Sequence, residues 1–277
     1  MSTFRGQREQ ARVWHDPNIE GIELLYATFI THTFPKHAHE SYGIGLSNQG
    51  AGIIQCHGTK HIAPPSHLIF FHPGEVHSGH ADEKGAWTYQ MIYLDVDLVV
   101  SALDGYSATL SFPKTTFQNL SVAASFSHLH KAFSKPASIL ERETLLQKFL
   151  NLLRQRACSS PATQRVYGER PAVRLVREYL EENYHKNVSI KTLAALTGLS
   201  PNYLVTAFRS EVGLPPHCYQ MQVRVRHAKE DLYTHKSLTQ VALDIGFYDQ
   251  SHFNRWFKRL VGVTPKSYRD SSFIQDR

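Results

Sequence analysis

The sequence predicts an α+β chain of two domains, an N-terminal β-barrel with helices and a C-terminal domain that is entirely helical. Short β-rich runs occupy the first half, whereas helical patterns occupy the second half. A helix–turn–helix pattern also occurs twice in the second half. The 277 residues are enough for two domains of ordinary size. We place these domains at residues 1–156 and 171–277, joined by a linker over 157–170.

The β-rich runs of the first half are separated by turn residues such as Gly, Pro and Asn and recur at intervals of roughly ten residues. Such spacing is typical of a barrel or a sandwich, and we expect the barrel to span about residues 15–110. The runs are GIELLYATFI, YGIGLSNQG, GAGIIQCHG, HLIFFHPGEVH and WTYQMIYLDVD.

Two helices are expected after the barrel, over Ser121–Phe133 and Ser138–Arg154. The second has an apolar stripe, formed by Ile139, Leu145, Leu146, Phe149, Leu152 and Leu153. Such a stripe most often packs on the domain's own sheet, and the alternative is a surface shared between protomers. We expect the helices between about 116 and 156 to pair two protomers in a homodimer.

The linker is predicted from QRACSSPATQRVYGER, which is small, polar and without apolar periodicity. Charge differs on its two sides. Residues 1–164 hold 13 Lys+Arg and 13 Asp+Glu, and residues 165–277 hold 17 and 11, so the whole net charge of +6 lies in the C-terminal part. A basic domain beside a neutral one suggests a polyanionic partner, and the alternative is a surface that only keeps the chain soluble.

The N-terminus, MSTFRGQREQARVWHD, lacks the apolar core of a signal peptide, and no segment approaches 18 consecutive apolar residues. The cysteines Cys56, Cys158 and Cys218 show no paired or metal-type spacing and no nucleophile motif. We therefore expect a cytoplasmic protein with reduced thiols and no membrane partner.

The repeated pattern runs from Val188 to Tyr219 and again from Ser237 to Tyr268. Gly198 matches Gly246 at a shift of 48 residues. At a constant shift of 49, Leu204, Phe208, Gly213, Pro216 and Tyr219 match Phe253, Phe257, Gly262, Pro265 and Tyr268. Five matches at one shift indicate a genuine repeat.

Each copy reads as helix, tight turn and helix, over about 188–213 and 237–262. Glycines that can adopt the left-handed conformation end the helices. Ser200 and Asp249 are good N-caps for the second helix of each copy. Pro216 to Thr234 reads as one helix that joins the copies, and its 19 residues would span about 28 Å, against about 34 Å for one turn of DNA.

The second helix of each copy has one face to bury and one to expose. Leu204 and Phe208 lie four residues apart, as do Phe253 and Phe257, so each pair shares a face. The opposite faces carry short polar groups and cations, which contact base edges and phosphates: Asn202, Thr206, Arg209, Ser251, Arg255 and Lys258. If the pattern occurred only once, this face could be an ordinary solvated helix face. Because it occurs twice in a basic domain, we expect these faces to bind double-stranded DNA.

Residues 172–270 closely resemble the DNA-binding domain of the AraC/XylS family of bacterial transcription regulators, whose signature is matched by DIGFYDQSHFNRWFKRLVGVTPKSYR. The resemblance implies sequence-specific binding at promoters, usually with activation of transcription and contact with RNA polymerase. By position, the base-reading residues would be Asn202, Val205, Thr206, Gln250, Ser251, Asn254 and Arg255. Val205 is suited only to a thymine methyl or a sugar. We expect Arg209, Lys258 and Arg259 to hold phosphates.

The stretches FPKHAHESYGIGLSNQGAG and LIFFHPGEVHSGH resemble the cupin-type barrel that often precedes this domain. His37, His39 and His77 match cupin motif positions and could bind a divalent transition metal, so a metal-dependent cupin enzyme that uses them is the alternative function. Cupin enzymes usually add a Glu four or five residues after the HxH motif, where this chain has Gly43 and Ile44. We therefore expect no metal, no cofactor and no enzymatic activity.

The preferred function of the barrel is to bind one small-molecule effector. Candidate lining residues are His39, Tyr42, His77, Trp87 and Tyr89. The linker would transmit the state of the barrel to the DNA-binding domain. Such coupling requires the effector to bind the DNA-competent arrangement more tightly than the other arrangement.

Overall fold

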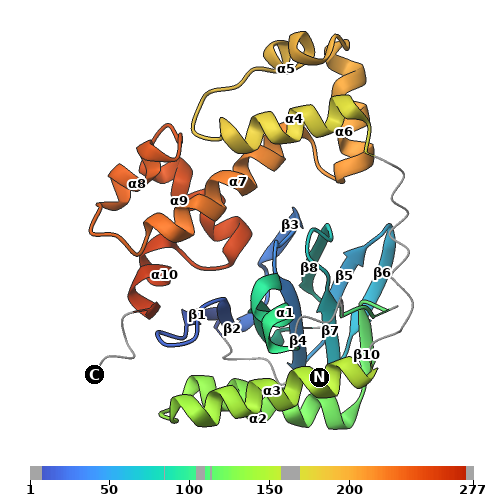
Figure 1. The fold of residues 1–277 in the computed structure, drawn as a ribbon, viewed down its shortest axis with the longest axis vertical. Coiled ribbons are helices and arrows are strands. Elements are labelled where there is room, and N and C mark those ends of the chain that lie inside the picture. The colour runs from blue at the N-terminus through green and yellow to red at the C-terminus, as the bar shows by residue number, and fades with distance from the viewer. Residues whose placement is uncertain (1–7, 84, 104–109, 113, 157–168, 273–277) are drawn as a thin grey trace. The chain divides into compact units, whose positions relative to one another are not determined.

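The computed structural model describes residues 8–83, 85–103, 110–112, 114–156 and 169–272 (Figure 1). The chain forms two compact units, which hold most of residues 1–164 and most of residues 165–270. This confirms the predicted fold class, an α+β chain with a β-sheet domain followed by a helical domain. Of the predicted linker, only residues 169 and 170 lie within the described residues.

The N-terminal unit contains two sheets. The six-stranded sheet has the order β1 (Gln10–His15), β2 (Ile22–Phe29), β9 (Trp87–Leu94), β4 (Tyr42–Gln49), β7 (His67–Phe71) and β10 (Thr116–Gln118). The four-stranded sheet has the order β3 (Thr33–His37), β8 (His77–Ala81), β5 (Gly52–Cys56) and β6 (Thr59–Ala63). The central strand β5 pairs antiparallel with both β6 and β8.

Helices α1 (Val96–Ala102), α2 (Leu120–Ser134) and α3 (Ile139–Arg156) pack on one face of the six-stranded sheet. Successive side chains of a strand point to opposite faces, so alternate residues of β4 such as Ile44 and Leu46 enter this core with Phe126 and Phe149. Full burial of each such side chain contributes about 1.5–3 kcal/mol. This core therefore fixes which face of β4 is turned toward the second sheet.

The other face of the six-stranded sheet meets the four-stranded sheet. The Trp87 ring lies where a side chain at Gly52 would be, since a Cβ there would be 2.4 Å from the indole. At another point the Phe71 ring stacks on His77, with centroids 3.6 Å apart. Large side chains of one sheet thus fill space left by small residues of the other, and the two sheets form the flattened barrel that the sequence predicts.

The apolar stripe of α3 is mostly buried within the chain itself. Leu146, Phe149 and Leu153 are at most 5% exposed and pack in the core under the six-stranded sheet, whereas Ile139 is 44% exposed. The stripe therefore covers the domain's own sheet, and the use of this stripe as a surface between protomers is corrected.

The C-terminal unit is helical, as expected. Its helices are α4 (Pro171–Glu182), α5 (Ile190–Thr197), α6 (Pro201–Val212), α7 (Pro216–Asp231), α8 (Leu238–Asp244), α9 (Gln250–Val261) and α10 (Pro265–Ser272). The Ser200 hydroxyl accepts from the backbone N–H of Tyr203, and the Asp249 carboxylate accepts from that of His252. These bonds satisfy backbone donors that the first turn of a helix leaves open, and they confirm both predicted caps.

Helix α7, which joins the two copies, ends at Asp231 and not at the predicted Thr234. Its 16 residues span about 24 Å, so it is shorter than expected. Two buried side chains anchor it: Gln220 and Arg224 both donate to the backbone carbonyls of Tyr184 and Lys186 in the loop after α4. The buried polar groups of α7 thereby fix its position against this loop.

No helix in the described ranges combines the length and the apolar character needed to cross a bilayer. Cys56 is buried and Cys218 is half-buried, and both are free thiols. The third cysteine, Cys158, lies outside the described residues.

Candidate DNA-binding surface and histidine cluster

The first helix–turn–helix unit consists of α5 and α6. Gly198 ends α5 with a φ of 69°, in the left-handed region that favours glycine. Leu204 and Phe208 of α6 are fully buried against Val176 and Leu180 of α4. Because that face of α6 is buried, the opposite face is the one left for a partner.

That opposite face carries the predicted reading residues of the first unit. Asn202, Thr206 and Arg209 are exposed, and Val205 is half-buried. The Thr206 hydroxyl donates to the backbone carbonyl of Asn202 at 3.0 Å. Since a hydroxyl has one proton, Thr206 presents its acceptor lone pairs and its methyl group to a partner.

The second unit consists of α8 and α9 and is built on a chain of aromatic rings. Phe253 and Phe257 of α9 are fully buried, with ring centroids 5.5 Å apart in an edge-to-face arrangement. Phe257 makes a similar contact with Tyr268 of α10 at 5.3 Å. Each such ring pair contributes about 0.5–1.5 kcal/mol beyond the stabilisation from the area that it buries. The pairs therefore fix the rotation of α9 about its own axis.

The cations and the serine predicted on α9 lie where a partner can reach them. Ser251, Arg255, Lys258 and Arg259 are all exposed. The Arg259 guanidinium lies over the Trp256 ring, 5.4 Å from its centroid. This stacking partly orders the Arg259 side chain before any contact with a phosphate.

The two predicted amide readers of α9 are constrained. The Gln250 side-chain oxygen accepts from the Thr239 hydroxyl at 2.8 Å, so the group that Gln250 presents is its NH2. Asn254 is half-buried, and its Oδ1 is buried without a hydrogen-bond partner among the described residues. In this conformation Asn254 does not offer both ends of its amide, so bidentate reading of an adenine would require its side chain to turn.

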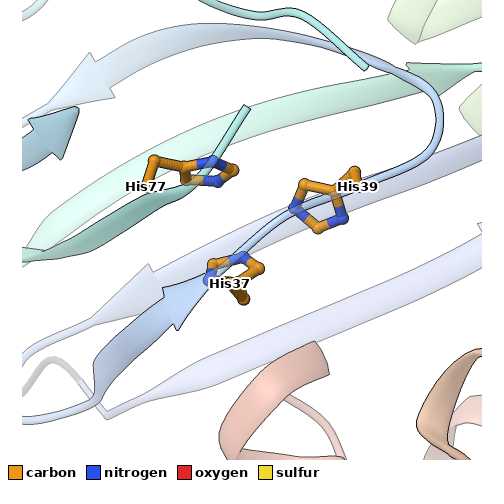
Figure 2. Close-up of side chains that lie close together, drawn as sticks. All are labelled: His37, His39 and His77. Atoms are coloured by element: carbon orange, nitrogen blue, oxygen red, sulfur yellow. The ribbon is translucent and has the colours of Figure 1, made fainter. Parts of the chain in front are cut away.

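The three barrel histidines of the cupin-like motifs come together. His37 ends β3, His39 lies two residues further on, and His77 begins β8. One ring nitrogen of each lies within 4.8 Å of the others (Figure 2). Nδ1 of His37 is 2.8 Å from the Pro35 carbonyl oxygen, and Nδ1 of His77 is 2.9 Å from the Glu75 carbonyl oxygen. A carbonyl oxygen only accepts, so both Nδ1 atoms carry a proton.

Trp87 and Tyr89 lie on the interior face of β9, with their rings stacked at 3.9 Å. The Trp87 indole N–H donates to the Ser47 hydroxyl at 3.0 Å. Tyr93 continues the same face of the strand and packs against His39, with ring centroids 4.6 Å apart. Tyr93 was absent from the residues predicted by sequence, although its spacing from Tyr89 places it on that face.

Tyr42 lies on the other side of the six-stranded sheet. Its ring packs 6.0 Å from that of Phe70 in the core under helices α2 and α3. Cross-strand pairing sets Tyr42 opposite Leu94 and Gly43 opposite Tyr93, so Tyr42 faces away from the histidines. The prediction that Tyr42 lines the same site as His39 is therefore corrected.

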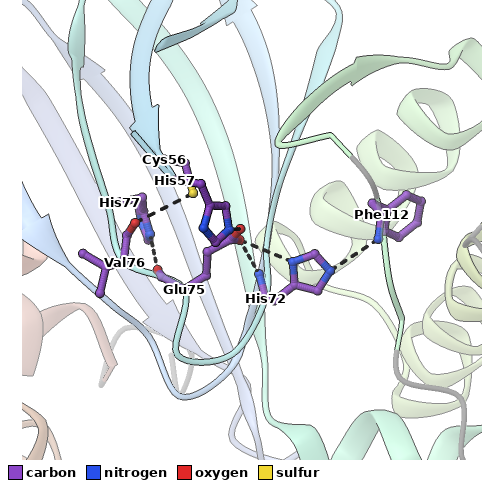
Figure 3. A network of polar contacts seen from close by, with 7 residues as sticks. All are labelled: Cys56, His57, His72, Glu75, Val76, His77 and Phe112. Carbon is purple, nitrogen blue, oxygen red and sulfur yellow. Dashed lines mark hydrogen bonds and ion pairs between the residues drawn. The ribbon is translucent and has the colours of Figure 1, made fainter. Parts of the chain in front are cut away.

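A second polar group surrounds Glu75, which the sequence showed only as part of the PGEVH stretch (Figure 3). His57 Nε2 lies 2.6 Å from one carboxylate oxygen, and the backbone N–H of His72 donates to the other at 2.9 Å. Burial alone would raise the pKa of Glu75, but the hydrogen bonds from His72 and His57 outweigh burial and lower that pKa to about 2.

Cys56 lies beside this carboxylate. Burial, and then the negative charge of Glu75, raise the pKa of the Cys56 thiol to about 12. The thiol is therefore protonated near neutral pH, and its Sγ lies 3.8 Å from the Val76 carbonyl oxygen. A thiolate nucleophile at Cys56 is excluded on these grounds.

Two family matches cover most of the chain. Residues 21–150 match the AraC-like ligand binding domain, and residues 193–271 match a helix-turn-helix domain. The chain is 30% identical over 249 residues to an uncharacterized HTH-type transcriptional regulator, YbfI, of Bacillus subtilis, which covers 89% of this chain and 90% of that protein.

A more distant relative is an uncharacterized HTH-type transcriptional regulator of Staphylococcus aureus, 27% identical over 157 residues, or 56% of this chain and 21% of that protein. Among solved structures, ToxT of Vibrio cholerae with an unsaturated fatty acid bound has a TM-score of 0.59 at 13% identity. The match covers 94% of this chain and 98% of that one, and at this identity it shows a shared fold.

Proposed function

The chain belongs to the AraC family of helix-turn-helix transcriptional regulators, and from this premise we propose that it activates transcription at specific promoters in response to a small molecule. It is a regulator and not a member of an enzyme family. The observation that carries the proposal is the pair α6 and α9. Each helix has a capped N-terminus and a left-handed glycine at its end, buries an apolar face, and exposes a polar and cationic one.

The exposed residues divide into two roles on DNA. Arg255 has the fork geometry that pairs with O6 and N7 of guanine, and the NH2 of Gln250 suits a base acceptor. Asn202, Ser251 and Thr206 contribute short polar groups, and Val205 a methyl contact. Asn254 contributes only if it turns. Arg209, Lys258 and Arg259 contact phosphates, which position the protein without reading sequence.

The effector is proposed to bind in the N-terminal unit, which matches a ligand-binding family. His39, His77, Trp87 and Tyr89 remain the proposed contacts. His77, Trp87 and Tyr89 lie on interior faces of the two sheets, and the ring of His39, in the segment after β3, packs against His77 and Tyr93. ToxT, which shares this fold, has been solved with an unsaturated fatty acid bound. This likeness supports an organic molecule as the effector class.

We further propose that the protein is cytoplasmic and acts there as a homodimer. On the DNA, the dimer would contact RNA polymerase. Exposed apolar side chains on α2 and α3 offer contacts for a second copy, since Leu120 and Leu140 are each 73% exposed and Ile139 is 44% exposed. Leu120, Leu140 and the exposed first residue of the stripe, Ile139, replace the buried part of the stripe as the proposed protomer contact.

The test is selection of genomic fragments by the full-length chain at moderate salt, followed by sequencing of the bound DNA. The expected motif has two patches separated by about one helical turn, roughly 10 base pairs. An Arg209→Ala/Arg255→Ala double variant is the matched control and should recover fewer fragments, with a motif that has lost the base position read by Arg255. Recovery of the same motif by the control, or of no motif by the wild type with or without a metabolite extract, would contradict the proposal.

A further inference from the structure

We propose that Arg170 is a positioning residue for DNA recognition, which holds α6 in the orientation in which its exposed face reads one of the two base patches. Nε of Arg170 lies 2.9 Å from Oε1 of Glu211, near the end of α6. Nη1 of Arg170 donates to the hydroxyl of Tyr203, in the first turn of α6, at 3.1 Å. One side chain from outside the helix thus contacts α6 near both of its ends. This inference rests on the proposed function, because it requires α6 to meet DNA.

The backbone before α4 places Arg170 for these contacts. Arg170 precedes Pro171, the first residue of α4, and the residue before a proline is restricted to extended conformations. Arg170 has a φ of −55° and a ψ of 135°, and its carbonyl accepts from the backbone N–H groups of Val173 and Arg174. Its own N–H lies outside the hydrogen bonds of α4 and donates to Oε2 of Glu211 at 2.9 Å. The two oxygens of Glu211 therefore bind the side chain and the main chain of the same residue.

The contacts form a network and not a single surface ion pair. An isolated ion pair in water contributes little, because it is screened and must order two flexible side chains. Here the guanidinium of Arg170 also lies over the ring of Tyr203, 5.9 Å from its centroid. The preceding residue is held as well, since Glu169 accepts two bonds of 3.0 Å from Arg177 of α4. The last two residues of the predicted linker are thus both fixed to the first helix–turn–helix unit and to α4.

The anchored side of α6 adjoins its reading face. Tyr203 and Glu211 lie eight residues apart, so they project from the same side of the helix. A helix turns by about 100° per residue, so Asn202 and Thr206 project about a quarter turn from that side. The buried apolar face of α6 holds it against α4, but apolar contact is not directional. The directional bonds of Arg170 oppose rotation of α6 about its axis, which would carry the reading residues away from the bases.

The second unit is built differently at the equivalent positions. At the shift of 49 residues, Glu211 corresponds to Leu260, which is buried and has no charge to pair. Tyr203 corresponds to His252, whose Nε2 accepts from the indole N–H of Trp256 in the same helix at 3.0 Å. Loss of the Arg170 contacts should therefore alter one base patch and leave the other unchanged.

The test is selection of genomic fragments by full-length variants in which either side of the ion pair is replaced. Arg170→Ala and Glu211→Ala should each weaken binding to the wild-type operator by about threefold to tenfold and relax the patch read by the first unit. The patch of the second unit, identified with Arg255→Ala, should keep its preferences. The Arg170→Ala/Glu211→Ala double variant should lose no more than the weaker single variant, because both changes break the same contact.

Arg174 and Glu178 supply the matched control, since they form a neighbouring pair on α4, 3.9 Å apart, and both are more than half exposed. Arg174→Ala and Glu178→Ala make the same charge changes and should leave the preferences of both patches unchanged. Hydrogen exchange of the free proteins gives a measurement independent of DNA. Arg170→Ala should speed the exchange of amides in α6 and not in α9. Melting temperatures establish that each variant folds.

Unchanged base preferences in Arg170→Ala, with DNA binding by the wild type, would overturn the inference and leave the regulator function intact. Loss of affinity in Arg170→Ala alone, with wild-type binding by Glu211→Ala and a salt slope reduced by about 0.9, would also overturn it, because Arg170 would then contact a phosphate directly. A wild type that selects no DNA refutes the regulator function. The exchange data then decide separately whether Arg170 holds α6.

Discussion

Gly246 lies directly against the backbone of His185: a Cβ at Gly246 would be 2.2 Å from the His185 carbonyl oxygen. Gly246 has a φ of 86° and follows α8, whereas His185 lies in the loop after α4. Gln220 and Arg224 of α7 bind the carbonyls of Tyr184 and Lys186, on either side of His185. One short loop thus holds both the joining helix and the turn of the second helix–turn–helix unit.

Gly246→Ala is therefore expected to destabilise the DNA-binding domain by more than about 3 kcal/mol, because backbone strain and a clash with another backbone act together. The matched control is Gly198→Ala at the equivalent turn. Gly198 has a φ of 69° and no atom within 4 Å of its Cβ position, so only the strain of about 1–2 kcal/mol applies. Thermal unfolding of the full-length variants measures both, and equal melting temperatures would refute the role of the His185 contact.

The helix–turn–helix units could be predicted from sequence because their determinants are local. Capping by Ser200 and Asp249 and termination at left-handed glycines depend on residues within a few positions. The end of α7 could not be predicted in this way. Leu232 remains in helical conformation, but the chain turns after Asp231, where Thr234 donates to the Asp231 carbonyl.

The strands of the six-stranded sheet were mostly predicted, whereas those of the smaller sheet were mostly missed. Strands β4, β7 and β9 are apolar on both faces, which gives continuous β-rich runs. Strand β8, HSGHA, has only His77, Gly79 and Ala81 on its inner face, and β3 contains Pro35. Neither has the apolar alternation that identifies a strand, yet both carry residues of the histidine cluster.

The site residues were predicted only in part, because the face of the sheet on which a side chain lies depends on the register of its strand. The HxH and PGEVH stretches identified His37, His39 and His77, which the structure groups. Tyr42 was misplaced because a shift of one residue along a strand reverses its face. Glu75 was missed because its partner His57 lies 18 residues earlier in the sequence, with strands β6 and β7 between them.

A buried ion pair ties α3 to the start of the barrel. Arg142 donates to Asp16 at 2.5 Å, and the other oxygen of Asp16 accepts from the backbone N–H groups of Asn18 and Ile19. Arg142→Ala leaves a buried carboxylate without its cation and should destabilise the protein by about 3–5 kcal/mol. Arg154→Ala, an exposed change on the same helix, is the control in urea unfolding. An Asp16→Asn/Arg142→Met double variant should recover part of the loss, and no recovery would indicate that packing and not charge is lost.

His130 makes stability depend on pH. Burial among Trp14 and Phe126 lowers its pKa to about 4, although a hydrogen bond to the Leu25 carbonyl opposes the shift. The unfolded chain therefore binds this proton first as the pH falls, so the stability is full above about pH 6.5 and is lost between about 6.5 and 4. The loss should approach about 3 kcal/mol. His130→Gln should flatten the curve of unfolding free energy against pH over this range, whereas the exposed His128→Gln should follow the wild type.

Arg255 is expected to read a base, and its replacement should alter specificity. Arg255→Ala should weaken binding to the selected operator by about 1–3 kcal/mol and relax one base position, with a small effect on scrambled DNA. Arg255→Lys keeps the charge but loses the bidentate fork, so it should bind scrambled DNA as the wild type does and still lack the base preference. Equal losses on cognate and scrambled DNA for Arg255→Ala would show that this residue holds a phosphate.

Lys258 lies three residues further along the exposed face of α9 and is expected to neutralise one phosphate. Lys258→Ala should weaken binding to every sequence alike, because the phosphate backbone is the same at all sites. The loss of one contact should also reduce the slope of log affinity against log salt by about 0.9, since one fewer counterion is released. Lys131→Ala, which removes an exposed cation of α2 in the N-terminal unit, should leave both the affinity and the slope unchanged. A Lys258→Ala variant with the wild-type slope would show that its ammonium group does not contact the DNA backbone, and the orientation of α9 in the groove would have to be revised.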